Sequence, residues 1–412
     1  MNKKILLFIA IVLAVTCSHA DNGSNSPYSR YGVGLLSDQS LGINRQMGGL
    51  GYGLRSHKYI NILNPASFSQ ADTLTMLFEA GISLQNVNFK ENGKSINAKN
   101  GSFDYIAIQF RVCKNLGLSA GFLPYSNVGY SFSTYSNKGT NEASVDNYSG
   151  TGGIYQPYIG LGWKPLESLS VGVMGSYIYG DITHNVGIDF ANSTDRTKTY
   201  NASLKSYKLD FGLQYARNFG KKNELVVGAT YSLGHDLNAD ATITEVTTDS
   251  TATKKIKDGF KLPHTFGLGF AYTYANKWKF GADYTLQQWG TSSFFGLDKG
   301  VDRSKISIGA EYAPDRLSSN IFKMITYRAG AYYAQPYTEY DGKKGCEEYG
   351  VSAGISLPFY NNNNRGSHAT LHISGQYIHM EPKSSGMIAE NYFRINIGIT
   401  FNENWFSKMK VR

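Results

Sequence analysis

Apolar and polar residues alternate along most of the chain, from residue 73 to residue 401. In residues 392–401 the odd positions are all Phe or Ile, whereas the even positions include Arg394, Asn396 and Thr400. Residues 305–312 and 348–357 repeat the scheme. Successive side chains of a β-strand point to opposite faces, so a period of two predicts strands with one apolar and one polar face.

Fourteen segments of this kind follow one another. They are residues 73–90, 101–112, 116–133, 150–163, 169–184, 200–219, 223–243, 258–274, 277–290, 302–312, 325–339, 346–357, 367–380 and 388–401. An even number of strands suits a closed transmembrane barrel, which has no unpaired edge in lipid. The pattern therefore predicts an all-β fold, a transmembrane antiparallel β-barrel, with a soluble secreted all-β protein as the alternative.

The lengths of the connections also favour a barrel. Short connections are expected at 113–115, 164–168, 220–222 and 275–276, and longer polar ones near 91–100, 134–149, 185–199, 244–257 and 291–301. Short turns are typical of the periplasmic end and long loops of the extracellular end. The connections 313–324 and 358–366 are long for periplasmic turns. Aromatic residues near strand ends are expected to form interface girdles: Tyr155, Tyr158, Trp163, Tyr177, Tyr179, Trp278 and Trp289.

Composition narrows the class of protein further. The chain has 412 residues, of which 17% are charged, with 45 Gly, 30 Tyr and three Cys. Three Cys exclude a disulfide scaffold, and the eleven-residue apolar run Ile5 to Val15 is too short for a membrane-spanning helix. Lys and Arg are scattered among Asp and Glu, so no nucleic-acid partner is expected.

The first twenty residues read as a cleaved secretory signal peptide. Lys3 and Lys4 precede the apolar run, and Ser18-His19-Ala20 provides small residues before Asp21. Their removal changes the formal charge from +9 to +7, because two Lys are lost. Acylation at Cys17 is the alternative, although Val15-Thr16 is a poor match for the small residues expected before a lipidated Cys. The expected location is the bacterial outer membrane.

Residues 21–72 differ from the rest, because they are rich in Gly and have few alternations. Such a segment before a barrel predicts a folded plug, with a loose periplasmic extension as the alternative. The predicted organisation is a signal peptide at 1–20, a hatch or plug at 21–72 and an outer-membrane barrel at 73–412.

The plug region carries a family resemblance. Leu41 to Gly51 is Gly-rich, and Asn64-Pro65-Ala66 follows shortly before the first strand. In this order the sequence resembles the FadL-type outer-membrane transport family. Those proteins are fourteen-stranded barrels with an N-terminal hatch that import long-chain fatty acids and other hydrophobic compounds. The resemblance implies that Asn64, Pro65 and Ala66 form the hatch motif.

A second match lies in the third strand, from Leu116 to Tyr130. In the family this strand has an inward kink that opens a lateral exit in the wall. Pro lacks a ladder donor and Gly weakens a strand, so a break is physically reasonable here. The expected kink residues are Pro124, Ser126, Asn127 and Gly129. An ordinary bulge or strand end is the alternative.

Charged residues on the polar parity are expected to face the lumen: Lys279, Asp283, Lys305, Glu311, Arg328, Glu348, His372 and Arg394. Such charges either pair and hold a plug in place or guide the anionic head of a ligand.

No catalytic, metal or cofactor site is predicted. Gly-x-Ser-x-Gly occurs around Ser119 and Ser352, but inside predicted strands rather than at a strand-to-helix turn. His372 and His379 lack further ligands at zinc spacing. Cys113 and Cys346 fall at opposite ends of the predicted barrel and are expected to be unlinked.

Two functions follow, with a barrel-embedded enzyme as a distant third. The first is passive uptake of a hydrophobic small molecule, with outer-membrane lipids as neighbours, hatch gating and lateral exit. The second is a non-transport barrel that serves as a partner or assembly factor for a secretion or surface-protein complex. No role is assigned to the tail Ser407 to Arg412.

Overall fold

The computed structural model describes most of the chain. The described residues are 23–91, 93–136, 143–190, 194–256, 260–295, 298–315, 320–340, 342–360, 368–384 and 387–404. The predicted signal peptide, Cys17 and the tail after residue 404 lie outside them. No helix among the described residues is long and apolar enough to cross a membrane.

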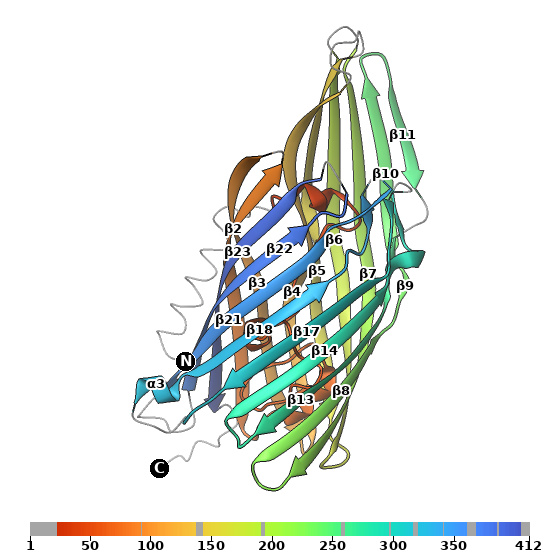
Figure 1. Ribbon diagram of the computed structural model, residues 1–412. Helices are drawn as coiled ribbons and strands as arrows, with labels where there is room; N and C mark the ends of the chain where they lie inside the picture. The colour runs from red at the N-terminus through yellow and green to blue at the C-terminus, as the bar shows by residue number, and fades with distance from the viewer. Residues whose placement is uncertain are drawn as a thin grey trace, which may run out of the picture.

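Fourteen antiparallel strands close into a barrel, as predicted (Figure 1). Strands β2 and β23 close the ring over sixteen paired positions, from Thr75 opposite Asn404 to Lys90 opposite Ala389. The strands are β2 (Thr75–Glu91), β3 (Lys94–Cys113), β4 (Leu116–Ser136), β5 (Ser144–Trp163), β6 (Leu169–Phe190), β7 (Arg196–Phe219), β8 (Asn223–Ser232) continued by β10 (Asn238–Thr247), β13 (His264–Tyr274), β14 (Trp278–Gln288), β17 (Arg303–Tyr312), β18 (Thr326–Ala334), β21 (Glu347–Tyr360), β22 (His368–Glu381) and β23 (Ala389–Asn404).

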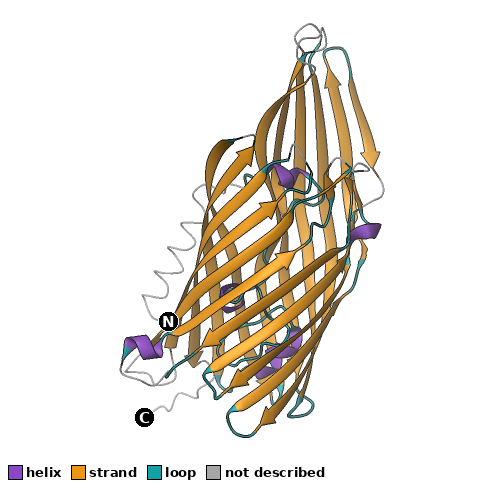
Figure 2. Cartoon of the chain, in the orientation of Figure 1, coloured by secondary structure: helices purple, strands orange, loops and turns teal. Residues whose placement is uncertain are grey.

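Shorter elements complete the fold (Figure 2). Strand β11 (Thr251–Ile256) forms a hairpin with β10. Two-residue strands are β1 (Leu35–Leu36), β9 (His235–Asp236), β12 (Lys261–Leu262), β15 (Ser293–Phe294), β16 (Asp298–Lys299), β19 (Glu339–Tyr340) and β20 (Lys343–Lys344). Helical turns are η1 (Pro27–Arg30), α2 (Gly42–Gln46), η2 (Pro65–Gln70), η3 (Trp289–Thr291) and α3 (Ile321–Met324).

The barrel is much taller on one side. Strands β4 to β7, with β10 and β11, project beyond the others at the end of the long connections (Figure 1). The connections predicted at 134–149 and 185–199 are therefore wrong in length, because β4 runs to Ser136, β5 begins at Ser144, β6 runs to Phe190 and β7 begins at Arg196. These extensions contain more polar residues than the rest of the strands, so the period of two is harder to recognise in them.

The outward parity is apolar, as the alternation predicts. Tyr155, Trp163, Tyr177 and Trp278 are exposed on the outer face, as girdle residues should be. Two of the proposed girdle residues are wrong. Tyr158 is on the inward parity of β5 and buried beside Ser119, with 3.2 Å between the hydroxyl oxygens. Trp289 is fully buried in η3 among aromatic side chains that fill the lumen.

The two cysteines of the described region are free, as predicted. Cys113 is exposed at the turn between β3 and β4, and Cys346 is buried just before β21.

Candidate functional site

Residues 23–74, which we call the plug segment, lie inside the ring of strands. Its turn η2 contacts β4, β5, β6 and β7, and its helix α2 contacts β18, β21, β22 and β23 on the other side. Gly172 and Gly228 of the wall allow this close packing. A Cβ on Gly172 would lie 2.3 Å from Pro65, and one on Gly228 would lie 1.8 Å from Tyr52. The small inward residues of β6 and β8 thus leave the room in which the plug backbone sits.

The predicted hatch motif lies at the start of η2. The Asn64 side chain accepts a hydrogen bond from Ala66 N at 3.1 Å, which makes Asn64 an N-cap, and Pro65 occupies the first helical position. The same side chain donates to Tyr52 O at 2.9 Å and to Leu213 O of β7 at 3.1 Å. Asn64 therefore links two parts of the plug segment to the wall.

Replacing Asn64 with Ala should loosen η2 without unfolding the barrel. The loss of an N-cap costs about 0.5–2 kcal/mol, which corresponds to faster amide exchange in η2 by roughly two- to thirty-fold. Hydrogen exchange measured by mass spectrometry tests this, with heat-modifiable migration as the check on barrel folding. Unchanged exchange in η2 would contradict the anchoring role.

A buried ion-pair cluster connects the plug segment to β3. Arg45 of α2 lies 2.5 Å from the carboxylate of Asp104 and 3.7 Å from that of Asp38. Burial alone would lower the pKa of Arg45, but the charges of Asp104 and Asp38 outweigh it and raise the pKa. Burial alone would raise the pKa of Asp38, but Arg45 and Lys305 outweigh it and lower the pKa. Arg45 and Asp38 therefore stay charged at neutral pH.

The predicted lumen charges all lie on the inward parity, and four of them hold the plug segment or one another. Arg328 pairs with Glu311 at 2.7 Å and donates to Gln46 of α2 at 2.9 Å. His372 hydrogen-bonds with Ser356 at 2.7 Å, and Ser356 in turn contacts Gln46. Asp283 accepts hydrogen bonds from the backbone N–H groups of Gly51 and Tyr52 at 2.6 and 2.9 Å.

The other four charged residues are half-buried rather than fully buried. Lys279 is half-buried opposite Glu311 in register. Glu348 faces Arg303 at 3.7 Å and accepts a hydrogen bond from the Tyr332 hydroxyl. Lys305 lies 4.4 Å from the centre of the Tyr332 ring. Arg394 donates to Gln85 at 2.9 Å.

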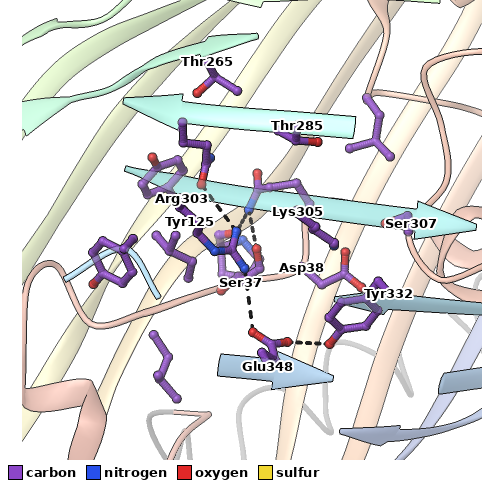
Figure 3. Close-up of a pocket in the computed structure, with 18 of the residues that line it drawn as sticks. Ser37, Asp38, Tyr125, Thr265, Thr285, Arg303, Lys305, Ser307, Tyr332 and Glu348 are labelled. Carbon is purple, nitrogen blue, oxygen red and sulfur yellow. Dashed lines mark hydrogen bonds and ion pairs between the residues drawn. The ribbon is translucent and has the colours of Figure 1, made fainter. Parts of the chain in front are cut away.

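A cavity of about 310 Å³ lies between the plug segment and the wall. One part of its lining is apolar and includes Leu35, Leu36, Leu262, Ile378 and Met380. The other part carries charges of both signs, among them Arg303, Lys305, Asp38 and Glu348 (Figure 3). The cavity thus presents an apolar surface beside a polar region with both positive and negative charges.

The wall of the barrel is interrupted next to this cavity. Strand β4 pairs with β3 only from Leu116 to Phe122, where Phe122 faces Ile106. Its pairing with β5 continues to Ser136, with a bulge at Tyr125. Within the described residues, 94–104 of β3 and 123–136 of β4 do not pair with each other. We call this interruption the wall slot.

The predicted kink residues lie along the wall slot and contact the plug segment. Ser126 and Asn127 pair with Leu36 and Leu35 of β1. Pro124 O accepts a hydrogen bond from the Gln39 side chain at 2.9 Å. A Cβ on Gly23 would lie 3.5 Å from Asn127 and 3.6 Å from Ser102, so the first described residue sits between the two strands. The plug segment therefore fills the lower part of the slot.

Several residues at this site could not be predicted from the sequence. The alternation of apolar and polar residues does not predict Asp38, Arg45 or Asp104. Asp38 and Arg45 lie in the plug segment, and Asp104 is an unpaired residue at a β-bulge opposite Gly81 and Ile82. A lone Asp among apolar residues of a strand is the one signal that points to it. Ser119 and Ser352 lie within β4 and β21, inside paired stretches.

A fourteen-stranded barrel around an N-terminal plug defines the FadL-type fold. Solved structures agree at the level of the fold. The Pseudomonas putida toluene transporter TodX matches with a TM-score of 0.59 and 16% identity, covering 91% of this chain and 100% of that one. The Ralstonia pickettii toluene transporter TbuX gives 0.54 and 17%, covering 88% and 98%. A Pseudomonas aeruginosa FadL homologue gives 0.57 and 10%, covering 90% and 99%.

The family model described as BamG matches residues 1–412. The chain therefore belongs to the BamG family. No curated protein matches the sequence.

Proposed function

We propose that this protein is a bacterial outer-membrane channel for passive uptake of hydrophobic small molecules. The observation that carries the proposal is that the cavity adjoins the wall slot, since Pro124, Tyr125 and Asn127 line both. The similar solved structures include transporters of toluene and a FadL homologue, which supports the proposal. The short turns then lie in the periplasm and the tall side of the barrel faces outward.

A lateral exit solves a physical problem for such a ligand. Release of a hydrocarbon chain into water costs about 0.8 kcal/mol for each exposed methylene. The wall slot would let the chain pass from the cavity into the membrane without that cost. Movement of β1 away from β4 is the gating step that this route requires.

We infer that Lys305 would bind the anionic group of a ligand such as a long-chain fatty acid in this cavity. Its volume is at the lower end of the roughly 300–1,000 Å³ that ligand pockets occupy. Lys305 lines the cavity, and within the described residues it forms no ion pair closer than 4 Å. A carboxylate in the cavity would supply its partner.

Replacing Lys305 with Met should weaken the binding of palmitate about tenfold and leave hexadecanol unaffected. A charge-assisted hydrogen bond contributes about 1.5 kcal/mol, and 1.4 kcal/mol is a factor of ten in affinity. Titration of the purified protein in detergent, followed by native mass spectrometry, measures both ligands. An equal loss for both would contradict a role for the charge.

Uptake itself is tested by comparing cells from which the gene has been deleted with the same cells complemented by the gene. Labelled palmitate and labelled toluene should enter faster in the complemented cells. Equal entry of both, with no lipophile extracted from the purified protein, would overturn the proposal.

A second candidate function is attachment to a secretion or surface-protein complex. It is favoured by the tall side of the barrel, where β4 to β7 extend past their neighbours (Figure 1). The two functions can coexist, because the cavity and these extensions occupy different levels of the barrel.

A further inference from the structure

A row of aromatic side chains lies on the outer face of the barrel, at the end opposite its tall side. Tyr274 of β13, Trp278 of β14, Tyr312 of β17 and Tyr327 of β18 stand opposite one another in register, and we call these four residues the aromatic row. The rings of Trp278 and Tyr312 are stacked, with 4.2 Å between their centres. Tyr274 and Trp278 are 54% and 41% exposed. Trp and Tyr rings on the outside of a barrel near its strand ends lie at the level of the lipid headgroups.

Four cationic side chains lie beside the aromatic row. Lys221 and Lys222 are in the turn between β7 and β8, and Lys277 is in the turn between β13 and β14 (Figure 1). The two turns are joined, because Asn276 N donates to Lys222 O at 2.9 Å. Arg217 precedes the first of them at the end of β7. We call Arg217, Lys221, Lys222 and Lys277 the cationic rim, and all four side chains are exposed.

Arg217 indicates where the membrane surface lies. It shares the outward parity of β7 with the exposed apolar residues Leu213 and Phe219, and its guanidinium lies 5.5 Å from the centre of the Phe219 ring. Leu225 of β8 pairs with both Arg217 and Tyr272 of β13, so a single strand separates Arg217 from β13. A cation on the lipid-facing parity is costly at the centre of a bilayer and is tolerated near its surface. The cationic rim therefore lies at the level of the lipid phosphates.

The carboxylates on the adjoining turns and strand ends are Glu167, Glu224 and Asp315. Glu167 pairs with Lys164 at 3.5 Å. Glu224 has the inward parity of the buried Val226, and its charge acts on Arg55 of the plug segment. Asp315 lies beside Lys323, because Asp315 N donates to Lys323 O at 2.9 Å. Each carboxylate thus has another cation nearby, and none of the ion pairs between described residues involves the cationic rim.

This combination favours a lipid with a net negative charge. Phosphate oxygens accept hydrogen bonds from Lys and Arg, and Trp and Tyr rings pack beside the glycerol region of a lipid. A zwitterionic headgroup would bring an ammonium group close to four cations, whereas phosphatidylglycerol brings none. An acidic soluble protein would meet the turns end-on, but not Tyr274 and Trp278, whose side chains face outward from the wall.

We propose that the cationic rim and the aromatic row bind an anionic phospholipid in the leaflet that faces the periplasm, such as phosphatidylglycerol. Lys222, Lys277 and Arg217 bind the headgroup phosphate, and Tyr274 and Trp278 pack beside its glycerol region. This rests on the proposed location in the outer membrane, but not on the uptake of any ligand.

The short turns provide a test variant and a matched control. Lys222→Gln with Lys277→Gln removes two charges from the cationic rim. Lys114→Gln with Lys164→Gln removes two charges from another pair of turns. These turns are also joined by a main-chain hydrogen bond, from Lys164 N to Asn115 O at 2.8 Å. The two double variants therefore change the net charge of the same end of the barrel equally.

The control pair lacks the other parts of the proposed site. Trp163, the aromatic residue next to Lys164, stands opposite Leu116 of β4 and Val171 of β6 rather than in an aromatic row. Lys164 is also paired with Glu167. A difference between the two double variants thus reports the site and not the net charge.

The test uses the full-length protein in nanodiscs that contain phosphatidylglycerol and phosphatidylethanolamine in equal amounts. Lipids that stay bound after release from the disc are counted by native mass spectrometry. The parent protein should retain phosphatidylglycerol about tenfold more than phosphatidylethanolamine, because each cation near a membrane surface changes affinity for an anionic lipid roughly fivefold. Lys222→Gln with Lys277→Gln should lower this retention at least about tenfold, and the control pair less than about twofold.

Arg217 gives a separate test of the charge. Arg217→Gln should lower the retention of phosphatidylglycerol roughly fivefold, and Arg217→Lys should restore most of it. Heat-modifiable migration confirms that each variant forms the barrel, as expected for substitutions of exposed side chains. Excess inorganic phosphate should not displace the lipid, because it has no glycerol region for the aromatic row.

Three results would overturn the proposal: equal retention of both lipids by the parent protein, an equal loss in the two double variants, or displacement of phosphatidylglycerol by phosphate. The outcome is independent of transport. Selective retention of phosphatidylglycerol by a protein that takes up no palmitate would support the lipid site and contradict only the channel.

Discussion

Replacing Arg45 with Met is expected to release the plug segment from the barrel wall. The guanidinium is buried and lies between Asp104 and Asp38. Its removal leaves the buried Asp104 and the half-buried Asp38 without their main counter-charge, and breaking a buried pair in this way typically costs about 3–5 kcal/mol. The amides of the plug segment should exchange at least about a hundredfold faster, and channels in planar bilayers should show larger conductance.

Two further variants decide whether charge is the cause. Arg45→Met combined with Asp104→Asn should recover much of the lost protection, because less uncompensated charge stays buried. Lys164→Met is the matched control, since Lys164 pairs with the fully exposed Glu167 at 3.5 Å and such surface pairs contribute little. If Arg45→Met left plug exchange and conductance as in the parent protein, the ion-pair cluster would not hold the plug.

A disulfide between β1 and β4 is expected to stop uptake. Leu36 and Ser126 face each other, and the neighbouring Ser37 N donates to Tyr125 O at 2.9 Å, so Leu36 and Ser126 form a non-hydrogen-bonded pair with close Cβ atoms. That geometry suits a disulfide. Leu36→Cys with Ser126→Cys, in a Cys113→Ser background, should reduce palmitate entry at least about tenfold until a reductant is added.

The single-cysteine variants are the controls for this experiment, because Ser126 also donates a hydrogen bond to Val33 O at 2.6 Å. Each of them should transport at close to the parental rate. Full uptake through the oxidised double variant, with the disulfide proven by mass spectrometry, would show that the ligand does not pass between β1 and β4.

The barrel could be predicted from the sequence because lipid imposes a strict rule on it. Every strand that crosses the membrane needs apolar residues at its outward-facing positions. The alternating residues Phe393, Ile395 and Ile397 therefore predict β23 without information about the strands beside it. The same rule does not predict the positions of Tyr158 and Trp289. An aromatic residue near a strand end gives the same sequence pattern whether its side chain points to lipid or to the lumen.

The site was less predictable, because its contacts join residues far apart in the chain. The polar parity shows that Arg328 and Asp283 point inward, but not which part of the plug segment they bind. Arg45 depends on Asp104 of β3, and Asp104 is placed by a bulge that breaks the alternation. Pro124 in the sequence predicts a break in β4. The length of the wall slot cannot be predicted in this way, because it depends on where β3 stops pairing with β4.

The closure of the barrel by its first and last strands sets an order on assembly. The plug segment binds β23 as well as β3 and β4: Ser26 donates to Glu390 at 2.7 Å, and Arg45 donates to Asn396 at 3.4 Å. These contacts do not exist until the C-terminal end of the chain has been made. Contacts between residues more than 300 positions apart form slowly, since the loop entropy must be overcome first. The plug segment therefore cannot complete its packing until β23 pairs with β2. Until then it is exposed to proteases and to aggregation.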